Sequence, residues 1–118
     1  MPSPDPRYPR HAALWSLVSE QTDDVDLAHD GEHVLRVYRW ALRLAPEAGA
    51  DVELTGAAAL VHDLVNIPKE HRDRPLGSEL SARASQGLLE NAGYTAPECD
   101  AIVEAVRTTS WSLSLIHI

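Results

Sequence analysis

Three residues in this chain, His33, His62 and Asp63, are of types that together could bind a metal ion. His33 shares a helical stripe with Val37, Trp40 and Leu44, which predicts that its imidazole points towards a protein interior. His62 and Asp63 directly follow the apolar run 57–61, where a carboxylate without a compensating charge would be costly. A divalent cation would compensate all three groups, so we expect a metal centre here.

Each of these signals also has a simpler interpretation. A neighbouring histidine and aspartate occur together by chance, and a histidine on an apolar stripe is commonly a hydrogen-bonded core residue. Their combination favours a shared site, because one helix, a turn and most of a second helix separate His33 from His62. Two antiparallel helices could therefore present both groups at one level. The ligand types suit Mn²⁺, Fe²⁺, Zn²⁺ or, less well, Mg²⁺, and do not select among them.

The elements that must position these groups are predicted to be helices. Apolar residues recur at helical spacing, or form buried runs between helix-ending signals, in five segments: 10–21, 30–45, 51–64, 77–92 and 95–109. Asp51 is a candidate N-cap, and Thr95 with Glu98 forms a capping-box pattern. Residues 1–9 contain four prolines and are expected to form a flexible lead-in, while 66–76 is expected to be an exposed loop. The sequence thus predicts an all-α fold, a compact bundle of about five helices.

Composition narrows the class of protein. The net charge of -8 argues against a nucleic acid polymer as partner, and the single cysteine, Cys99, suits a reducing compartment. The chain contains no secretory apolar segment and no stretch of membrane-spanning length. We therefore expect a cytoplasmic protein that contacts no membrane. Its oligomeric state is left open.

Two segments resemble the HD-domain superfamily of metal-dependent phosphohydrolases. Residues 29–37 (HDGEHVLRV) are similar to that family's first histidine segment, and residues 57–64 (AAALVHDL) to the segment that gives the family its name. Residues 66–69 and 78–85 are similar to the loop and helix that follow, so the resemblance extends from about Asp26 to Ser112. It implies that His33, His62 and Asp63 bind a divalent metal ion, which we expect to be Mn²⁺, with Mg²⁺, Fe²⁺ or Zn²⁺ as alternatives. It also implies hydrolysis of a small phosphorylated metabolite, with a nucleotide as the expected class.

Other residues receive roles from the same resemblance. Arg36 and Lys69 would bind the substrate phosphate, although Arg36 could instead form a surface ion pair with Glu32, and Lys69 could be an ordinary loop lysine. His29 and Asp30 would assist catalysis with Asp63, by orienting a ligand histidine or moving a proton, and Asp30 could also be an N-cap. Three histidines outside the motifs, His11, His71 and His117, are interpreted as surface residues. Trp40 and Trp111 are interpreted as core or packing residues rather than base-stacking platforms, and Cys99 is not expected to be a nucleophile.

The C-terminal region departs from the family pattern. The family's second aspartate ligand has no counterpart here, because Asp100 comes too early, and Thr109 stands where relatives usually carry a histidine. Residues 113–118 (LSLIHI) match nothing in the family and are interpreted as a non-native tail. We therefore expect an HD-type domain over residues 10–112 that is incomplete at its C-terminus. The alternatives to a phosphohydrolase are a catalytically inactive HD fragment and a helical module for ligand sensing or interaction.

Overall fold

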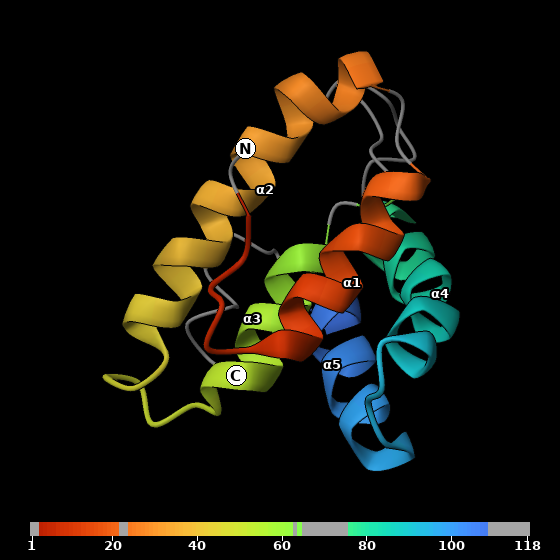
Figure 1. Ribbon diagram of the computed structural model, residues 1–118. Coiled ribbons are helices and arrows are strands. Elements are labelled where there is room, and N and C mark those ends of the chain that lie inside the picture. Colours follow the sequence, from red (N-terminus) through yellow and green to blue (C-terminus); the bar gives the residue numbers. More distant parts are fainter. Residues whose placement is uncertain (1–2, 22–23, 63, 65–75, 109–118) are drawn as a thin grey trace.

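The computed structural model describes residues 3–21, 24–62, 64 and 76–108, and within these ranges it describes no side chains for residues 24–30, 76–78 and 108. Figure 1 shows the helices that these ranges contain. The helices are α1 (Pro9–Glu20), α2 (Asp24–Leu44), α3 (Val52–Val61), α4 (Leu76–Asn91) and α5 (Ala96–Thr108). Over the described ranges every regular element is helical, which confirms the all-α prediction. None of these helices combines the length and the apolar character needed to cross a bilayer.

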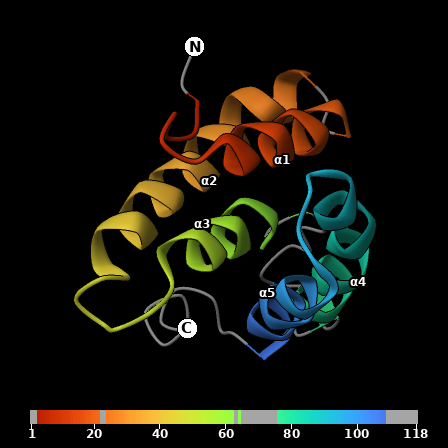
Figure 2. The same cartoon turned by 60° about the horizontal axis from the view of Figure 1, so that its bottom comes forward.

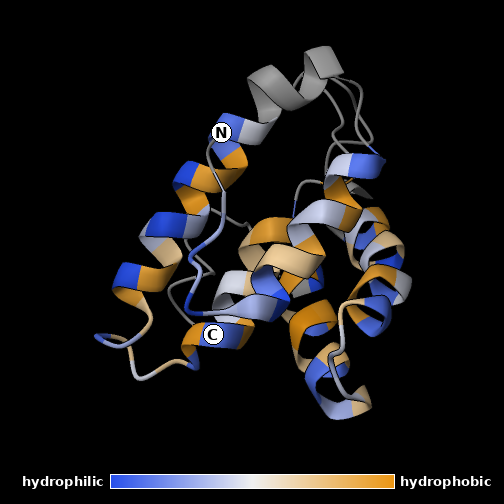
Figure 3. Ribbon diagram, viewed as in Figure 1, coloured by the Kyte–Doolittle hydropathy of each residue, from blue (hydrophilic) through white to orange (hydrophobic). Residues whose placement is uncertain are grey.

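Helix α3 is the centre of the fold. All residues from Thr55 to Val61 are buried, so this helix has no polar face and must be covered on every side. It packs against α1, α2, α4 and α5 (Figure 2), and the chain directions of α2 and α3 are opposite (Figure 1). The surrounding helices have polar outer faces and apolar inner ones, as the colouring of Figure 3 shows. The apolar run that precedes His62 is therefore the core element of the bundle.

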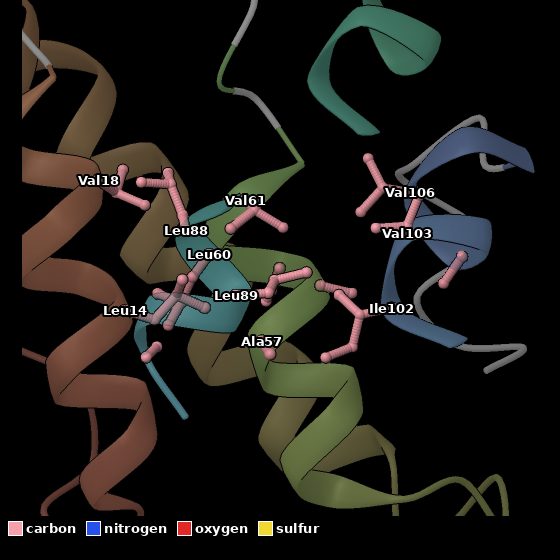
Figure 4. Close-up of a cluster of buried hydrophobic side chains, with 14 of the residues drawn as sticks. Leu14, Val18, Ala57, Leu60, Val61, Leu88, Leu89, Ile102, Val103 and Val106 are labelled. Atoms are coloured by element: carbon pink, nitrogen blue, oxygen red, sulfur yellow. The ribbon is translucent and has the colours of Figure 1, made fainter. Parts of the chain in front are cut away.

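The core is built from small and aliphatic side chains. Ala57, Ala58 and Ala59 are fully buried, and their small size lets the neighbouring helices approach α3 closely. Larger side chains from the other helices fill the remaining space, among them Leu14, Leu89 and Ile102 (Figure 4). Cys99 is buried as well, and burial raises the pKa of its thiol, which disfavours the thiolate that a nucleophile requires.

The helix ends follow the predicted capping signals. The Asp51 carboxylate accepts a hydrogen bond from the Leu54 amide at 2.9 Å, as an N-cap should. At α5 the Thr95 amide donates to the Glu98 carboxylate at 2.9 Å, and the Glu98 amide donates to the Thr95 hydroxyl at 3.4 Å. This reciprocal pair confirms the capping box. After α4, Gly93 takes a positive φ of 102°, a conformation that ends helices and favours glycine.

The start of α2 differs from the sequence prediction. The helix begins at Asp24 rather than at Asp30, so His29 and Asp30 lie inside it and Asp30 is not an N-cap. The predicted loop 66–76 lies outside the described residues except for Leu76, where α4 begins. Upstream of α1, the Asp5 amide donates to the Tyr38 hydroxyl at 3.1 Å. Part of the proline-rich lead-in is thus attached to α2.

Candidate metal centre

His62 lies at the C-terminal end of the buried helix α3, as its C-cap residue, with helical backbone angles. Its side chain is only 5% exposed, because the bundle that encloses α3 also encloses this last residue. The Nδ1 atom lies 2.5 Å from the Ala59 carbonyl oxygen. A carbonyl oxygen can only accept a hydrogen bond, so Nδ1 must carry the proton. This contact selects the tautomer in which Nε2 holds the lone pair.

The surroundings of His62 also keep its ring neutral. The pKa of His62 is lowered to about 4, mainly by desolvation on burial and also by the nearby His33, against the opposing effect of the Ala59 hydrogen bond. The imidazole is therefore uncharged at neutral pH. A neutral ring with a protonated Nδ1 bonded to a carbonyl is the form in which histidine binds metals through Nε2.

His33 projects from α2 towards His62. The two ring centroids are 6.2 Å apart, and the ring planes are inclined by 61°. His33 is exposed, whereas His62 is buried, so the pair spans the boundary between solvent and core. Sequence reasoning predicted that two antiparallel helices would bring these histidines to one level, and in the structure their rings are neighbours.

The spacing of the two rings can be compared with that of a shared metal site. A metal-bound histidine nitrogen lies about 2.1 Å from the ion, which puts the ring centroid about 3.2 Å away from it. Two rings on one ion therefore have centroids about 4.5 to 6.4 Å apart, depending on the angle between the ligands. The observed 6.2 Å lies within this range, near its open end. A shared ion at this spacing would need an angle of about 150° between the two nitrogens, wider than the roughly 109° of a tetrahedral site.

The other predicted site residues cannot be placed in the same way. Asp63 and Lys69 lie outside the described residues, and so do the side chains of His29 and Asp30. Within the described part of the chain, no group of three or more histidine, cysteine, aspartate or glutamate residues gathers around one point. The structure thus brings together two of the three predicted ligands and describes no position for the third.

Arg36 is exposed on α2, three residues after His33, and is therefore on the same side of the helix. The alternative for this residue was an ion pair with Glu32, but among the described side chains these two form none. Further along α2, a different arginine, Arg43, packs on the Trp40 ring, with its guanidinium carbon 5.4 Å from the ring centroid. The guanidinium of Arg36 remains available to an anion near His33.

Two predictions about α2 and α1 were wrong. Trp40 is 54% exposed rather than a core residue, because the buried face of α2 consists of Val34, Leu35, Tyr38, Ala41 and Ala45. The predicted stripe was therefore displaced by about one residue around the helix, which also explains why His33 is exposed. His11, interpreted as a surface residue, is completely buried. Its spacing from Leu14 and Val18, both buried, was the signal that could have revealed this.

A hollow of about 410 Å³ lies between the N-terminal segment and α2, lined in part by Asp5, Tyr38 and Arg39. None of the predicted site residues lines it. The hollow is therefore separate from the His33–His62 pair.

Comparison with known proteins supports the resemblance seen in the sequence. The sequence model of the family described as HD domain matches residues 30–110, which is more than half of the chain and includes both histidines. No curated protein and no solved structure gives a significant match. The chain belongs to the HD domain family.

Proposed function

We propose that this protein is a metal-dependent phosphohydrolase that cleaves a small phosphorylated metabolite, with a nucleotide as the expected substrate class. The observation that carries the proposal is the His33–His62 pair, whose rings lie 6.2 Å apart on two different helices. Membership of the HD domain family, whose members are generally hydrolases that bind divalent metals, gives the pair its context. The proposed ligands are His33, His62 and Asp63, and the proposed ion is Mn²⁺.

When bound, a divalent ion supplies Lewis acidity and lowers the pKa of water. The chain contributes the orientation of the ligands. The Ala59 carbonyl holds the His62 ring in one tautomer and one orientation, so that little reorganisation is needed on binding. Burial keeps this ring neutral, and a neutral imidazole needs to lose no proton before it binds an ion.

Substrate binding is proposed to depend on cationic side chains around the pair. Arg36 lies one helical turn beyond His33 and would contact the substrate phosphate, together with Lys69. An arginine can donate two hydrogen bonds to one phosphate group, which fixes both its position and its orientation. His29 and Asp30 are proposed to orient a ligand histidine or to transfer a proton.

The protein is also proposed to be cytoplasmic.

Phosphate release from a panel of nucleoside phosphates, measured with Mn²⁺ and after treatment with a chelator, tests this function. We expect release that depends on the metal and that is abolished in both His62→Ala and Asp63→Ala. His71→Ala is the matched control, because His71 lies outside both motif segments. Release that survives either His62→Ala or Asp63→Ala would show that the proposed centre is wrong.

Elemental analysis of the purified protein separates the alternatives. Bound metal without phosphate release from any substrate would support an inactive HD domain. Absence of bound metal after incubation with Mn²⁺, Fe²⁺, Zn²⁺ or Mg²⁺ would favour a helical module for sensing or interaction.

A further inference from the structure

His11 forms two hydrogen bonds that join the two helices carrying the candidate ligands. Its Nε2 atom lies 2.8 Å from the Glu53 carbonyl oxygen in α3, and its Nδ1 atom lies 2.7 Å from the Tyr38 hydroxyl in α2. The carbonyl can only accept, so Nε2 carries the proton and Nδ1 accepts from the hydroxyl. The Tyr38 oxygen in turn accepts from the Asp5 amide. One ring from α1 thus connects α2 to α3.

The packing around His11 leaves the ring no other position. A β-carbon built on Gly56 of α3 would lie 2.6 Å from His11 Cε1 and 3.0 Å from Nε2, so only glycine leaves room for the imidazole. On the opposite side the Tyr38 ring meets His11 edge to face, with centroids 5.2 Å apart and planes at 86°. His11 is fully buried as a result. At this level the imidazole lies between Tyr38 of α2 and Gly56 of α3.

The neighbouring residue fixes α1 itself. Arg10 Nε lies 2.7 Å from the Glu53 carboxylate in α3, and Arg10 Nη1 lies 2.8 Å from Glu98 in α5. The guanidinium also packs over the Tyr94 ring, 4.2 Å from its centroid. Helix α1 is therefore held on the bundle independently of His11. We call the His11 ring with its hydrogen bonds to Tyr38 and Glu53 the crosspiece. Its position is fixed by α1 and not by α2 or α3 alone.

His11 contacts the two helices at different distances from the candidate metal centre: its contact on α3, at Glu53, is nine residues or about 13.5 Å from His62. Tyr38 follows His33 by five residues on α2, a rise of about 7.5 Å, and Glu53 lies on the short helix α3 that ends next to His62. α2 and α3 also pack directly on each other. Because helices are rigid over such lengths, a change in their spacing at Tyr38 and Glu53 would also move the His33 and His62 rings relative to each other. The residues 30–110 matched by the family do not include α1.

We propose that His11 is a positioning residue for the metal centre, which sets the separation of His33 and His62 by joining α2 to α3. This inference rests on the proposed function for its consequence in catalysis. The geometric claim applies to the metal-free protein and can be tested without substrate.

Two substitutions each remove one of the two hydrogen bonds of His11. His11→Asn keeps a polar atom near the Nδ1 position, which faces Tyr38, and loses the contact with α3. His11→Gln keeps one near the Nε2 position, which faces Glu53, and loses the contact with α2. Thr95→Ala is the matched control, because it removes the cap of α5 and lowers stability without touching the junction of α2 and α3.

The first readout is the nuclear Overhauser effect between ring protons of His33 and His62 in the metal-free protein. We expect its intensity to fall by more than half in both His11 variants and to be retained in Thr95→Ala. The second readout is the Kd for Co²⁺, followed by its absorption spectrum, which should rise about tenfold in both His11 variants and less than twofold in the control. Where a His11 variant does not fold, Tyr38→Phe removes only the hydroxyl and should change both readouts in the same direction.

An unchanged Overhauser effect and an unchanged Co²⁺ Kd in both folded His11 variants would overturn the proposal, whatever their stability. A wild-type protein that binds no Co²⁺ would contradict the proposed function, while the Overhauser measurement would still decide the role of His11. The two claims can thus fail separately.

Discussion

The two buried histidines, His11 and His62, differ in what surrounds their rings. Both nitrogens of His11 are used by groups of the protein itself, one by the Tyr38 hydroxyl and one by the Glu53 carbonyl. His62 has its Nδ1 atom on the Ala59 carbonyl, and its ring is faced by the imidazole of His33. The first arrangement consumes the hydrogen-bonding capacity of the ring within the fold. The second orients one nitrogen and places another candidate ligand, His33, beside the ring.

This difference separates a structural histidine from a candidate ligand more clearly than burial does. His11 is less exposed than His62, and burial is the main cause that lowers the pKa of both. The neighbours of the rings distinguish them: the His33 ring faces His62, whereas the Tyr38 hydroxyl and the Glu53 carbonyl bind the two nitrogens of His11. Substitutions of His62 should therefore remove a proposed ligand, whereas substitutions of His11 should act on metal binding only through helix packing.

The largest expected effect is on metal affinity. His62→Ala should weaken Mn²⁺ binding at least about a hundredfold, which corresponds to about 2.7 kcal/mol, because it removes the buried ligand. Calorimetric titration measures this directly, with His71→Ala as the control. Mn²⁺ binding that is equally strong in wild type and His62→Ala would show that His62 is not a ligand and differs from His11 in no functional respect.

The next effect concerns the packing around His11. Gly56→Ala should lower the free energy of unfolding by about 2 kcal/mol, because the added methyl group meets a ring held at both nitrogens. Gly87 is the matched control: it is exposed on α4, and a β-carbon there would have no neighbour within 4 Å. Gly87→Ala should therefore raise stability by about 0.5 to 1 kcal/mol. Urea denaturation of both variants measures whether the two changes in the free energy of unfolding have opposite signs. A stabilising Gly56→Ala would show that the His11 ring is not confined.

A third effect is the dependence of stability on pH. The pKa of His62 in the folded state, about 4, is below the ordinary value of about 6.5, so the unfolded chain binds more protons between these values. The metal-free protein should therefore lose about 2 kcal/mol of stability from this residue between about pH 7 and pH 5. His11, whose pKa is also lowered by burial, adds to the loss in the same direction.

Urea denaturation at the two pH values, with a chelator present, measures this slope. His62→Gln should reduce it, and Thr95→Ala should leave it unchanged. A slope that is equal in wild type and His62→Gln would contradict the lowered pKa.

The smallest effect is expected at Arg36, on the solvent side of His33. Arg36→Ala should raise the KM for a phosphorylated substrate about fivefold and change kcat little, because one phosphate contact is lost in both ground and transition states. Arg83→Ala on α4 is the control, since Arg83 is exposed and already paired with Glu79. A KM equal to that of wild type would remove Arg36 from the substrate site.

The sequence predicted the framework well because the relevant signals are local. The uniformly apolar run 57–61 predicted the central helix, and the caps at Asp51 and Thr95 are formed by residues close to them in sequence. The approach of His33 to His62 followed from the lengths of two helices and the turn between them. Each of these inferences needed only one segment or two consecutive ones.

The wrong predictions for His11 and Trp40 depended on contacts between distant segments. Whether His11 is buried is decided by Tyr38 and Gly56, which belong to other helices. Trp40 is exposed because Tyr38 and Ala41 form the inner face of α2, and the spacing of apolar residues allowed either choice. The start of α2 at Asp24 also escaped prediction.

The central claim is that His33 and His62 bind the same metal ion. Pulsed electron paramagnetic resonance on the Mn²⁺-loaded protein, labelled with ¹⁵N at histidine, measures this most directly by counting the coupled nitrogens. We expect two imidazole nitrogens in the wild type and one in each of His33→Ala and His62→Ala. A wild-type spectrum without coupled imidazole nitrogen, or one that neither substitution changes, would contradict the claim.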